Sequence, residues 1–346
     1  MNQHPTPTPP RKNAARRVTV EAQYAGQRID NYLHRILGAT HGELPRSLIY
    51  RILRTGEVRI NSQRAKPTTR VSTGDEIRIP PLHHRPDRDP NDPDAPVTVP
   101  NYWLERAESM IVLEDADLLI VNKPGGLAVH GGSNIPFGLI DLMRQHLDNP
   151  PLLELAHRID RDTSGLVVLA KSLAALGHIQ NQFRPEGNAE KTYLTLVHGH
   201  WPDHLTRIDV PLRKWQGEGE AHRVVVDPQG KPAVTHFSTL AANAHASLLK
   251  VGLETGRTHQ IRVHAAHADY PVIGDSKYGQ RILDKRLTPK AGERHTLLLH
   301  ATALTLHHPV NGTLLRLVAP VPDTWKVWTD ALNLAIPTEF APKSPA

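Results

Sequence analysis

The sequence predicts a mixed α+β protein with two globular parts, and three observations support this fold class. The chain has 346 residues, which is long for one average domain. Its first 80 residues contain 14 Lys or Arg and 6 Asp or Glu, whereas the remainder contains 27 and 29, so the excess positive charge lies at the front. Beyond residue 105, expected strands outnumber expected helices without regular alternation, which favours a mixed sheet over a doubly wound parallel one.

The front part is predicted to begin with a disordered basic arm at 1–16 and to continue as a compact module at 17–80. The arm is rich in proline and polar residues, so it has too little apolar surface to offset the entropy lost on ordering. In the module, two stretches with apolar residues at helical spacing precede alternating residues typical of strands. The helical apolar positions are Ile29, Leu33, Ile36, Leu37, Leu48, Ile49, Ile52 and Leu53.

The second expected helix has one basic side. It starts near Pro45, which suits a first helical turn, and Gly56 ends it. At about 100° per residue, Arg46, Arg51 and Arg54 lie opposite its apolar residues. This side could bind the phosphates of a polyanion, although the charge fits a solvated surface equally well.

A linker at 81–104 is predicted to separate this module from a larger second part. Seven prolines between residues 80 and 100, mixed with Asp, His and Arg, indicate a stiff extended segment. The second part is expected at 105–335, followed by a disordered tail at 336–346. Its short apolar runs are rich in β-branched residues, which is typical of strands. Strands are expected at 111–113, 118–121, 166–170, 193–197 and 248–253, and helices at 139–146, 174–183 and 259–268.

Composition excludes several classes of protein. The chain has no cysteine, which rules out disulfides, thiolate metal ligands and cysteine nucleophiles. The sequence contains no run of about 18 apolar residues, the length needed to span a bilayer. Its first residues lack the apolar centre of a secretory signal. We therefore expect a cytoplasmic protein without a membrane partner.

The segment HRIDRDTSG at 157–165 is the first candidate for chemistry. It is a polar loop that enters an apolar strand, a place where a reactive group can be held rigidly. Asp160 and Asp162 could act as a carboxylate pair in glycoside hydrolysis, or the segment could simply be a stable turn. Ser164 does not fit a nucleophile elbow, because that motif requires glycine at position 162.

The segment TGRTHQIRVH at 255–264 is rich in cations and has almost no acidic neighbours. Arg257 and Arg262 therefore need an anionic partner, either a carboxylate from elsewhere in the fold or nucleic-acid phosphates. The histidines His259, His264 and His267 could be metal ligands, but no Cys, Asp or Glu completes a recognisable spacing, so no metal site is predicted.

Two further segments are less specific. Lys191 and Tyr193 lie on one face of an expected strand, where Tyr193 either packs in the core or stacks on an unpaired base. The glycines of KPGGLAVHGGS at 123–133 indicate turns rather than a phosphate loop, because no Gly-Lys-Ser or Gly-Lys-Thr follows.

These segments, in this order, resemble the motifs of the RluA-type pseudouridine synthases. The family signature HRLDxxTSG occurs as HRIDRDTSG at 157–165, with Ile in place of Leu as the one departure. Four more motifs match, NKPxGxxVH at 122–130, KxYxxxVxG at 191–199, GRTHQIRVH at 256–264 and LLLHATALTLHHP at 297–309. Residues 17–80 are similar to an S4 RNA-binding domain. The resemblance implies an S4-like domain followed by a mixed-sheet catalytic domain.

The resemblance also implies roles for individual residues. Asp160 would be the catalytic aspartate, Tyr193 would stack on the target base, and Arg262 would pair with Asp160. A neighbouring guanidinium favours the ionised carboxylate and fixes its orientation. Arg158 would help to hold the flipped nucleotide. Further substrate or RNA contacts are assigned to His157, Arg257, Arg46, Arg51 and Arg54.

The implied activity is the isomerisation of specific uridines in 23S rRNA to pseudouridine. The target base must leave its stack, and the reaction is expected to need neither metal nor cofactor. The expected partner is 23S rRNA or a large-subunit assembly intermediate, and the expected state is a monomer. Whether Asp160 attacks as a nucleophile or removes the C2′ proton stays open. Rival interpretations are a non-catalytic RNA-binding protein and a carbohydrate- or nucleoside-active hydrolase using Asp160 and Asp162.

Overall fold

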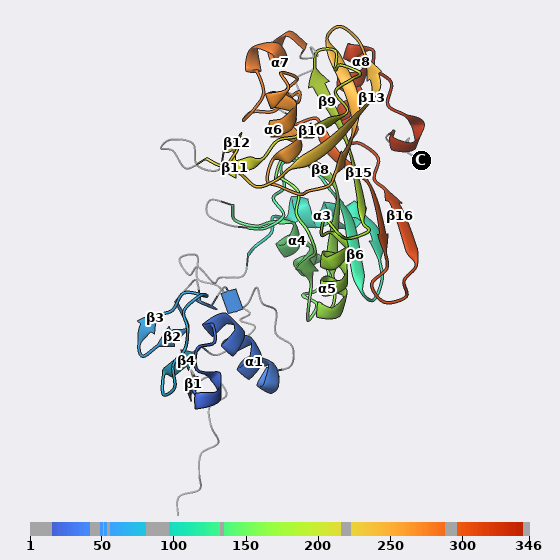
Figure 1. Ribbon diagram of the computed structural model, residues 1–346. Coiled ribbons are helices and arrows are strands. Elements are labelled where there is room, and N and C mark those ends of the chain that lie inside the picture. Colours follow the sequence, from blue (N-terminus) through green and yellow to red (C-terminus); the bar gives the residue numbers. More distant parts are fainter. Residues whose placement is uncertain are drawn as a thin grey trace, which may run out of the picture. The chain divides into compact units, whose positions relative to one another are not determined.

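The chain divides into two compact units, Met1–Pro96 and Val97–Ala346 (Figure 1). The computed structural model describes residues 16–41, 49–50, 52–53, 56–80, 97–131, 135–215, 223–287 and 296–341. Each unit has its own hydrophobic core. Helices and a large mixed sheet are both present, so the predicted α+β class is confirmed. Within the described part of the chain, every helix is too short or too polar to cross a membrane.

The first unit contains a four-stranded antiparallel sheet in the order β1-β4-β2-β3. Its elements are β1 (Arg16–Thr19), the 3-10 helix η1 (Ala22–Tyr24), α1 (Ile29–His41), β2 (Arg59–Ile60), β3 (Gln63–Arg64) and β4 (Glu76–Ile79). Its core joins the predicted apolar positions of α1 and of helical residues 49–50 and 52–53 with alternate residues of β4. Arg46, Arg51 and Arg54 lie outside the described residues, so the basic helix side and the S4-like character stay predictions.

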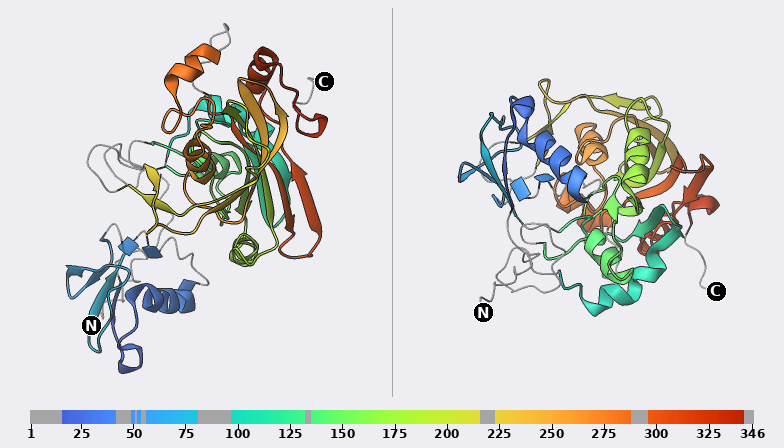
Figure 2. Two further views of the ribbon diagram at one scale, coloured as in Figure 1. Left: turned by 45° about the horizontal axis from the view of Figure 1, so that its top comes forward. Right: turned by 90° about the horizontal axis from the view of Figure 1, so that it is seen from below.

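The second unit is built on a ten-stranded mixed sheet. Eight strands follow the order β10-β13-β14-β9-β15-β8-β6-β5, with β16 on β15 and β7 on β8 (Figure 1 and Figure 2). The strands are β5 (Ile111–Glu114), β6 (Leu118–Lys123), β7 (Glu154–Leu155), β8 (Ser164–Ala170), β9 (Glu190–His198), β10 (Arg207–Asp209), β13 (Val234–Ala242), β14 (Ala246–Leu253), β15 (Leu299–His307) and β16 (Leu314–Val318). A separate hairpin pairs β11 (Leu212–Lys214) with β12 (Val224–Val226).

Helices pack on both faces of the large sheet. Side chains alternate between the two faces of a strand, and Val121 and Ile120 of β6 accordingly belong to different clusters. The cluster of Val121 includes residues of α3 (Asn101–Met110), α4 (Leu139–His146) and α6 (Gln260–His267). On the other face lie α5 (Leu173–Gln182) and α8 (Thr324–Leu332). The remaining helical elements are α7 (Arg281–Leu287) and η2 (Thr338–Phe340).

A parallel strand pair at the centre of this sheet positions the candidate site. Gly165 of β8 is the register partner of Ala301 in β15, and Ala301 is also the partner of Tyr193 in β9. Gly165 has a φ of +113°, and a Cβ there would lie 2.3 Å from Ala301 O, so the close approach requires glycine. The turn that contains Asp160 leads directly into β8, so the sheet brings that turn close to Tyr193.

The predicted element types are largely confirmed, but three boundaries are wrong. The predicted helices agree with α4, α5 and α6 to within one residue at each end. Arg16 begins β1 instead of ending the arm. Asn101 begins α3 inside the expected linker, because Val99 and one side of this helix complete the core. Phe340, in the expected tail, packs near α8, and its carbonyl oxygen accepts a hydrogen bond from Val321 N–H at 3.0 Å.

Candidate active site

Asp160 lies in the turn between β7 and β8, and a buried lysine fixes that turn. Lys123, at the end of β6, donates from Nζ to three main-chain oxygens, those of Pro124, Leu127 and Arg161, at 2.9, 2.8 and 2.9 Å. Burial lowers the pKa of Lys123 to about 7, although the charges of two nearby carboxylates act in the opposite direction. The three acceptors match the three donors of an ammonium group, so the main chain beside Asp160 is firmly held.

The carboxylate of Asp160 is bound by Arg262 of α6. Arg262 Nη1 donates to Asp160 Oδ2 at 3.1 Å. The same guanidinium binds both oxygens of Asp275, through Nε at 2.7 Å and Nη2 at 2.8 Å. The side chain of Arg262 is 5% exposed and that of Asp275 is fully buried, whereas that of Asp160 is 17% exposed. Asp160 is therefore the most solvent-accessible of the three.

Burial and pairing oppose each other in this group of three charges. Burial alone would raise the pKa of Asp275, but the hydrogen bonds and charge of Arg262 outweigh it and the pKa is lowered. Burial likewise acts to lower the pKa of Arg262, and its two carboxylate partners raise it overall. Main-chain N–H groups of Lys277 and Tyr278 also donate to Asp275 Oδ1, at 2.8 and 3.0 Å. Arg262 is thus held charged and oriented by Asp275, with Nη1 directed at Asp160.

His259 and Tyr278 lie beside this ion pair. His259 Nε2 is 3.8 Å from Asp160 Oδ2, and His259 Nδ1 is 2.7 Å from Tyr278 Oη. Tyr278 Oη accepts a hydrogen bond from Val224 N–H at 2.9 Å, and its ring centroid is 5.2 Å from Arg262 Cζ. Burial is the main cause that lowers the pKa of His259 to about 4, so the imidazole is neutral near pH 7. Tyr278 therefore links β12, His259 and the Arg262 guanidinium.

His259 also has an unusual backbone conformation. Its φ and ψ are 56° and 18°, in the left-handed region that few non-glycine residues adopt. The residue directly precedes α6, so this conformation orients the helix that carries Arg262. Non-glycine residues in this region persist only where the surroundings hold them, and such residues are concentrated at functional sites.

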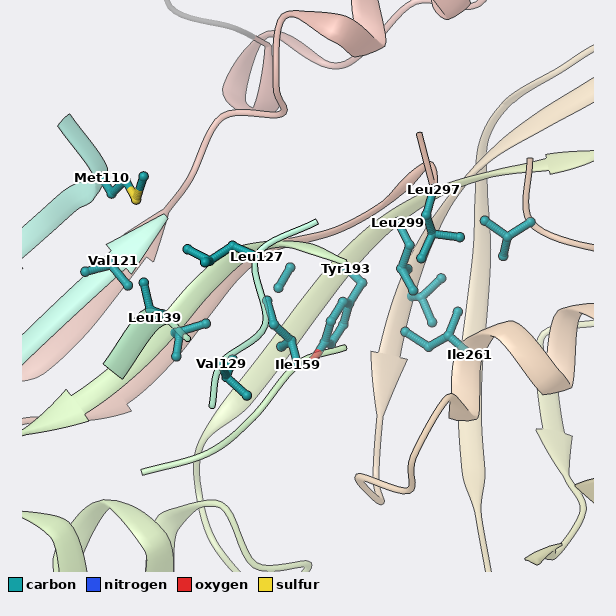
Figure 3. Packing of buried hydrophobic residues seen from close by; sticks show 14 of the residues in the cluster. Met110, Val121, Leu127, Val129, Leu139, Ile159, Tyr193, Ile261, Leu297 and Leu299 are labelled. Atoms are coloured by element: carbon teal, nitrogen blue, oxygen red, sulfur yellow. The ribbon is translucent and has the colours of Figure 1, made fainter. Parts of the chain in front are cut away.

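Tyr193 forms part of the core next to the Asp160 turn. It is 7% exposed and shares a cluster with Ile159, Ile261 and Leu299 (Figure 3). Burial, with a smaller contribution from the charge of Asp160, raises the pKa of its phenol, which stays neutral. Among the described residues, its hydroxyl has no hydrogen-bond partner. The ring is thus buried in the same neighbourhood as Asp160.

The other residues assigned to RNA contacts have different environments. Arg158 is exposed, two positions before Asp160. His157 Nε2 accepts a hydrogen bond from Val168 N–H at 3.1 Å, and burial lowers the pKa of this ring to about 3. Arg257 is exposed, and its Nε donates to Pro232 O at 3.0 Å. His157 is therefore engaged in packing, whereas Arg158 and Arg257 are accessible to a ligand.

Two alternative chemistries find little support in the geometry. The Asp162 carboxylate is 34% exposed and accepts a hydrogen bond from Arg161 Nε at 2.9 Å, whereas Asp160 is bound by Arg262. Ser164 Oγ is 2.8 Å from His300 Nδ1, but both residues are buried. Since His300 Nε2 is 3.1 Å from a main-chain oxygen, this Ser-His contact is structural. Both nitrogens of His264 also contact protein oxygens, at 2.8 and 3.2 Å.

The sequence motifs do not identify Asp275, Tyr278 or the role of Lys123. The cations at 255–264 predict an anionic partner, but the motifs do not indicate that this partner is Asp275, 13 residues beyond Arg262. A signal exists in the two glycines that begin and end the segment GDSKYG at 274–279. Gly274 has a φ of +79°, and a Cβ there would lie 1.9 Å from Thr296 O, which indicates a tightly constrained turn.

Comparisons with known proteins agree on one family. Residues 117–267 match the RNA pseudouridylate synthase family. The chain is 41% identical over 320 residues to ribosomal large subunit pseudouridine synthase C of Pasteurella multocida (strain Pm70), which covers 92% of this chain and 94% of that protein. It is 40% identical over 309 residues to the protein of the same name from Escherichia coli (strain K12), covering 89% and 94%. The solved structure of human RNA pseudouridylate synthase domain containing 4 is 26% identical, with a TM-score of 0.55 over 69% of this chain and 99% of that chain.

Proposed function

The chain belongs to the RNA pseudouridylate synthase family, and we propose that it isomerises specific uridines of 23S rRNA to pseudouridine with Asp160 as the catalytic carboxylate. Relatives named as large-subunit pseudouridine synthases support the choice of rRNA. The observation that carries the role of Asp160 is its contact with Arg262, a buried guanidinium already fixed by Asp275.

The reaction explains why one carboxylate suffices. The C1′–N1 bond breaks, the uracil turns, and C5 bonds to C1′. One proton leaves C5 and one is gained at N1, so reactant and product contain the same atoms. An ionised carboxylate begins this sequence either by attacking the nucleoside or by removing the C2′ proton. Both routes need the same preparation, a charged and oriented Asp160.

The surroundings of Asp160 orient it. Arg262 donates to the carboxylate and uses only Oδ2. Oδ1 has no hydrogen-bond partner among the described residues, so it is the oxygen directed to the nucleoside in this proposal. Lys123 holds the adjacent main chain, which keeps the carboxylate in place while the uracil turns.

Base flipping completes the proposal. A uridine in folded RNA is stacked, and its extrusion costs a few kcal/mol that new contacts must offset. Tyr193 is an aromatic ring close to Asp160 that is 7% exposed, so in this proposal the extruded base stacks on the small part of the ring that the core leaves uncovered. Arg158 is exposed nearby and can bind the flipped nucleotide through its phosphates. The substrate is then 23S rRNA or a large-subunit assembly intermediate, bound in the cytoplasm by one copy of the chain.

The test is to incubate the protein with 23S rRNA that lacks pseudouridine. The proposal predicts a carbodiimide-reactive product at discrete uridines without any change in RNA mass. Release of free uracil or sugar would instead support a hydrolase. Tight RNA binding without any product would support a non-catalytic RNA-binding protein.

A further inference from the structure

The sheet of the first unit has an arginine on each of its four strands at the same level. Arg17 of β1 is the register partner of Arg78 in β4, and Arg78 is the partner of Arg59 in β2. Arg59 is in turn the partner of Arg64 in β3. We refer to Arg17, Arg78, Arg59 and Arg64 as the arginine row. It crosses the whole sheet from one edge strand to the other.

The arginine row lies on the solvent-facing side of this sheet. Directly opposite residues of antiparallel strands project from the same face. The neighbouring positions Ile77 and Ile79 of β4 belong to the buried cluster that α1 covers. All four arginines are exposed. The row therefore occupies the face of the sheet opposite α1, and it consists of other residues than the helix side predicted from Arg46, Arg51 and Arg54.

Among Arg17, Arg59 and Arg78, only Arg17 forms an ion pair with a described residue. Arg17 pairs with Glu76, Nη1 to Oε1, at 2.6 Å. Arg59 Nη1 donates to a main-chain oxygen, that of Ser62, at 3.3 Å. Arg78 lies between Arg17 and Arg59, and its guanidinium has no partner among the described residues. Like charges directly opposite each other destabilise a sheet, so a bound anion would reduce this repulsion.

We propose that the arginine row binds the phosphate backbone of the RNA substrate. Adjacent strands are about 4.8 Å apart, so the row spans about 14 Å, enough for several phosphates of one RNA strand. Guanidinium groups bind phosphate oxygens through paired N–H donors. The occupant is RNA because the proposed function, on which this inference rests, requires a large RNA to be held while one uridine reacts. Such contacts give affinity without sequence specificity.

The experiment compares two double variants of the full chain that remove the same charge. R59Q/R78Q removes two members of the arginine row. R35Q/K66Q removes two exposed cations of the same unit that lie outside the sheet strands. Affinity for a 23S rRNA fragment is measured as a function of salt concentration, and amide hydrogen exchange of β4 reports the stability of the sheet.

The proposal predicts that R59Q/R78Q binds the fragment about tenfold more weakly at low salt, with a salt slope lower by about 2. R35Q/K66Q should lose less than half as much affinity and slope. Protection of β4 should be unchanged or higher in R59Q/R78Q, because like-charge repulsion has been removed. A merely structural role would lower that protection.

Three results would overturn the proposal. The first is an equal loss of RNA affinity in both variants, which would reflect net charge alone. The second is unchanged RNA affinity in R59Q/R78Q. The third is a selective loss of binding to phosphatidylserine vesicles with RNA binding intact, which would assign the row to a lipid surface. Pseudouridine formation by the wild-type protein is measured separately, so failure of the proposed function is distinguishable from failure of this inference.

Discussion

The two units of this chain hold their arginines in opposite ways. Arg262 in the second unit is buried and binds two carboxylates, whereas Arg78 in the first unit is exposed and has no partner among the described residues. A buried, paired guanidinium has one position, which suits a single reacting group. An exposed guanidinium keeps its rotamers and can follow a phosphate backbone. Rigidity is therefore concentrated around Asp160, and adaptable positive charge lies in the first unit.

Replacing Arg262 by alanine should have the largest effect. The change leaves Asp275 buried without its cation, and loss of one partner of a buried ion pair typically costs about 3–5 kcal/mol. Urea unfolding followed by tryptophan fluorescence measures this loss, since all five tryptophans lie in the second unit. The control is Arg257→Ala, at an exposed site, where a change below about 0.5 kcal/mol is expected. Equal losses of unfolding free energy in the two variants would contradict the difference between the buried and the exposed arginine.

Lowering the pH compares the stability of the two units without a mutation. Burial lowers the pKa of His259, His264 and His300 to about 4, below the 6.5 of an ordinary histidine. Between these values the unfolded chain binds more protons than the folded chain, so stability should fall as the pH falls from about 6.5 towards 4. The described side chains of the first unit include no buried histidine. Hydrogen exchange at each pH should show the second unit losing protection first, and a parallel loss in both units would be evidence against this.

Removing the hydroxyl of Tyr278, beside Asp160, should lower stability by an intermediate amount. Tyr278→Phe leaves Val224 N–H and His259 Nδ1 without their partner, and an unsatisfied buried group costs about 1–3 kcal/mol. Turnover of uridine should also fall, because His259 loses the contact that orients it near Asp160. The matched control is Tyr270→Phe, since the Tyr270 hydroxyl has no hydrogen-bond partner among the described residues. If the two variants had the same kcat and stability, the role given to Tyr278 would be wrong.

Arg78→Gln should have the smallest effect on folding. Its guanidinium is exposed between two other arginines, so its removal should leave the protection of β4 against hydrogen exchange unchanged or slightly raised. The same variant should bind RNA more weakly. A clear loss of protection would mean that Arg78 supports the sheet, and the two kinds of arginine would no longer differ as described.

Local sequence patterns account for much of the fold. The apolar spacing in α1, α4 and α5 and the short β-branched runs of β6, β8 and β14 all lie where periodicity places them. The patterns do not predict α3, which has only two buried residues, Ala107 and Met110. Nor could they predict the strand order, because the parallel pairing of Gly165 with Ala301 joins residues far apart in the chain. Such pairing depends on tertiary packing that no local window contains.

Sequence motifs likewise predict some residues of the candidate site and not others. The motifs singled out Asp160, Tyr193 and Arg262, and these residues lie close together in the structure. The residues that position them were missed because their contacts are distant in sequence or made to main-chain atoms. Lys123 reaches a carbonyl oxygen 38 residues away. The glycines around Asp275 indicate a constrained turn, but the pattern does not show which side chain its carboxylate binds.

The central claim is tested most directly by counting pseudouridines made by two carboxylate variants. Asp160→Asn and Asp162→Asn remove the same charge two positions apart in one turn. Each protein is incubated with 23S rRNA lacking pseudouridine, and RNA affinity is measured in parallel. We predict that Asp162→Asn still forms pseudouridine, whereas Asp160→Asn binds the RNA with near wild-type affinity and forms none. Pseudouridine formation by Asp160→Asn would contradict the account.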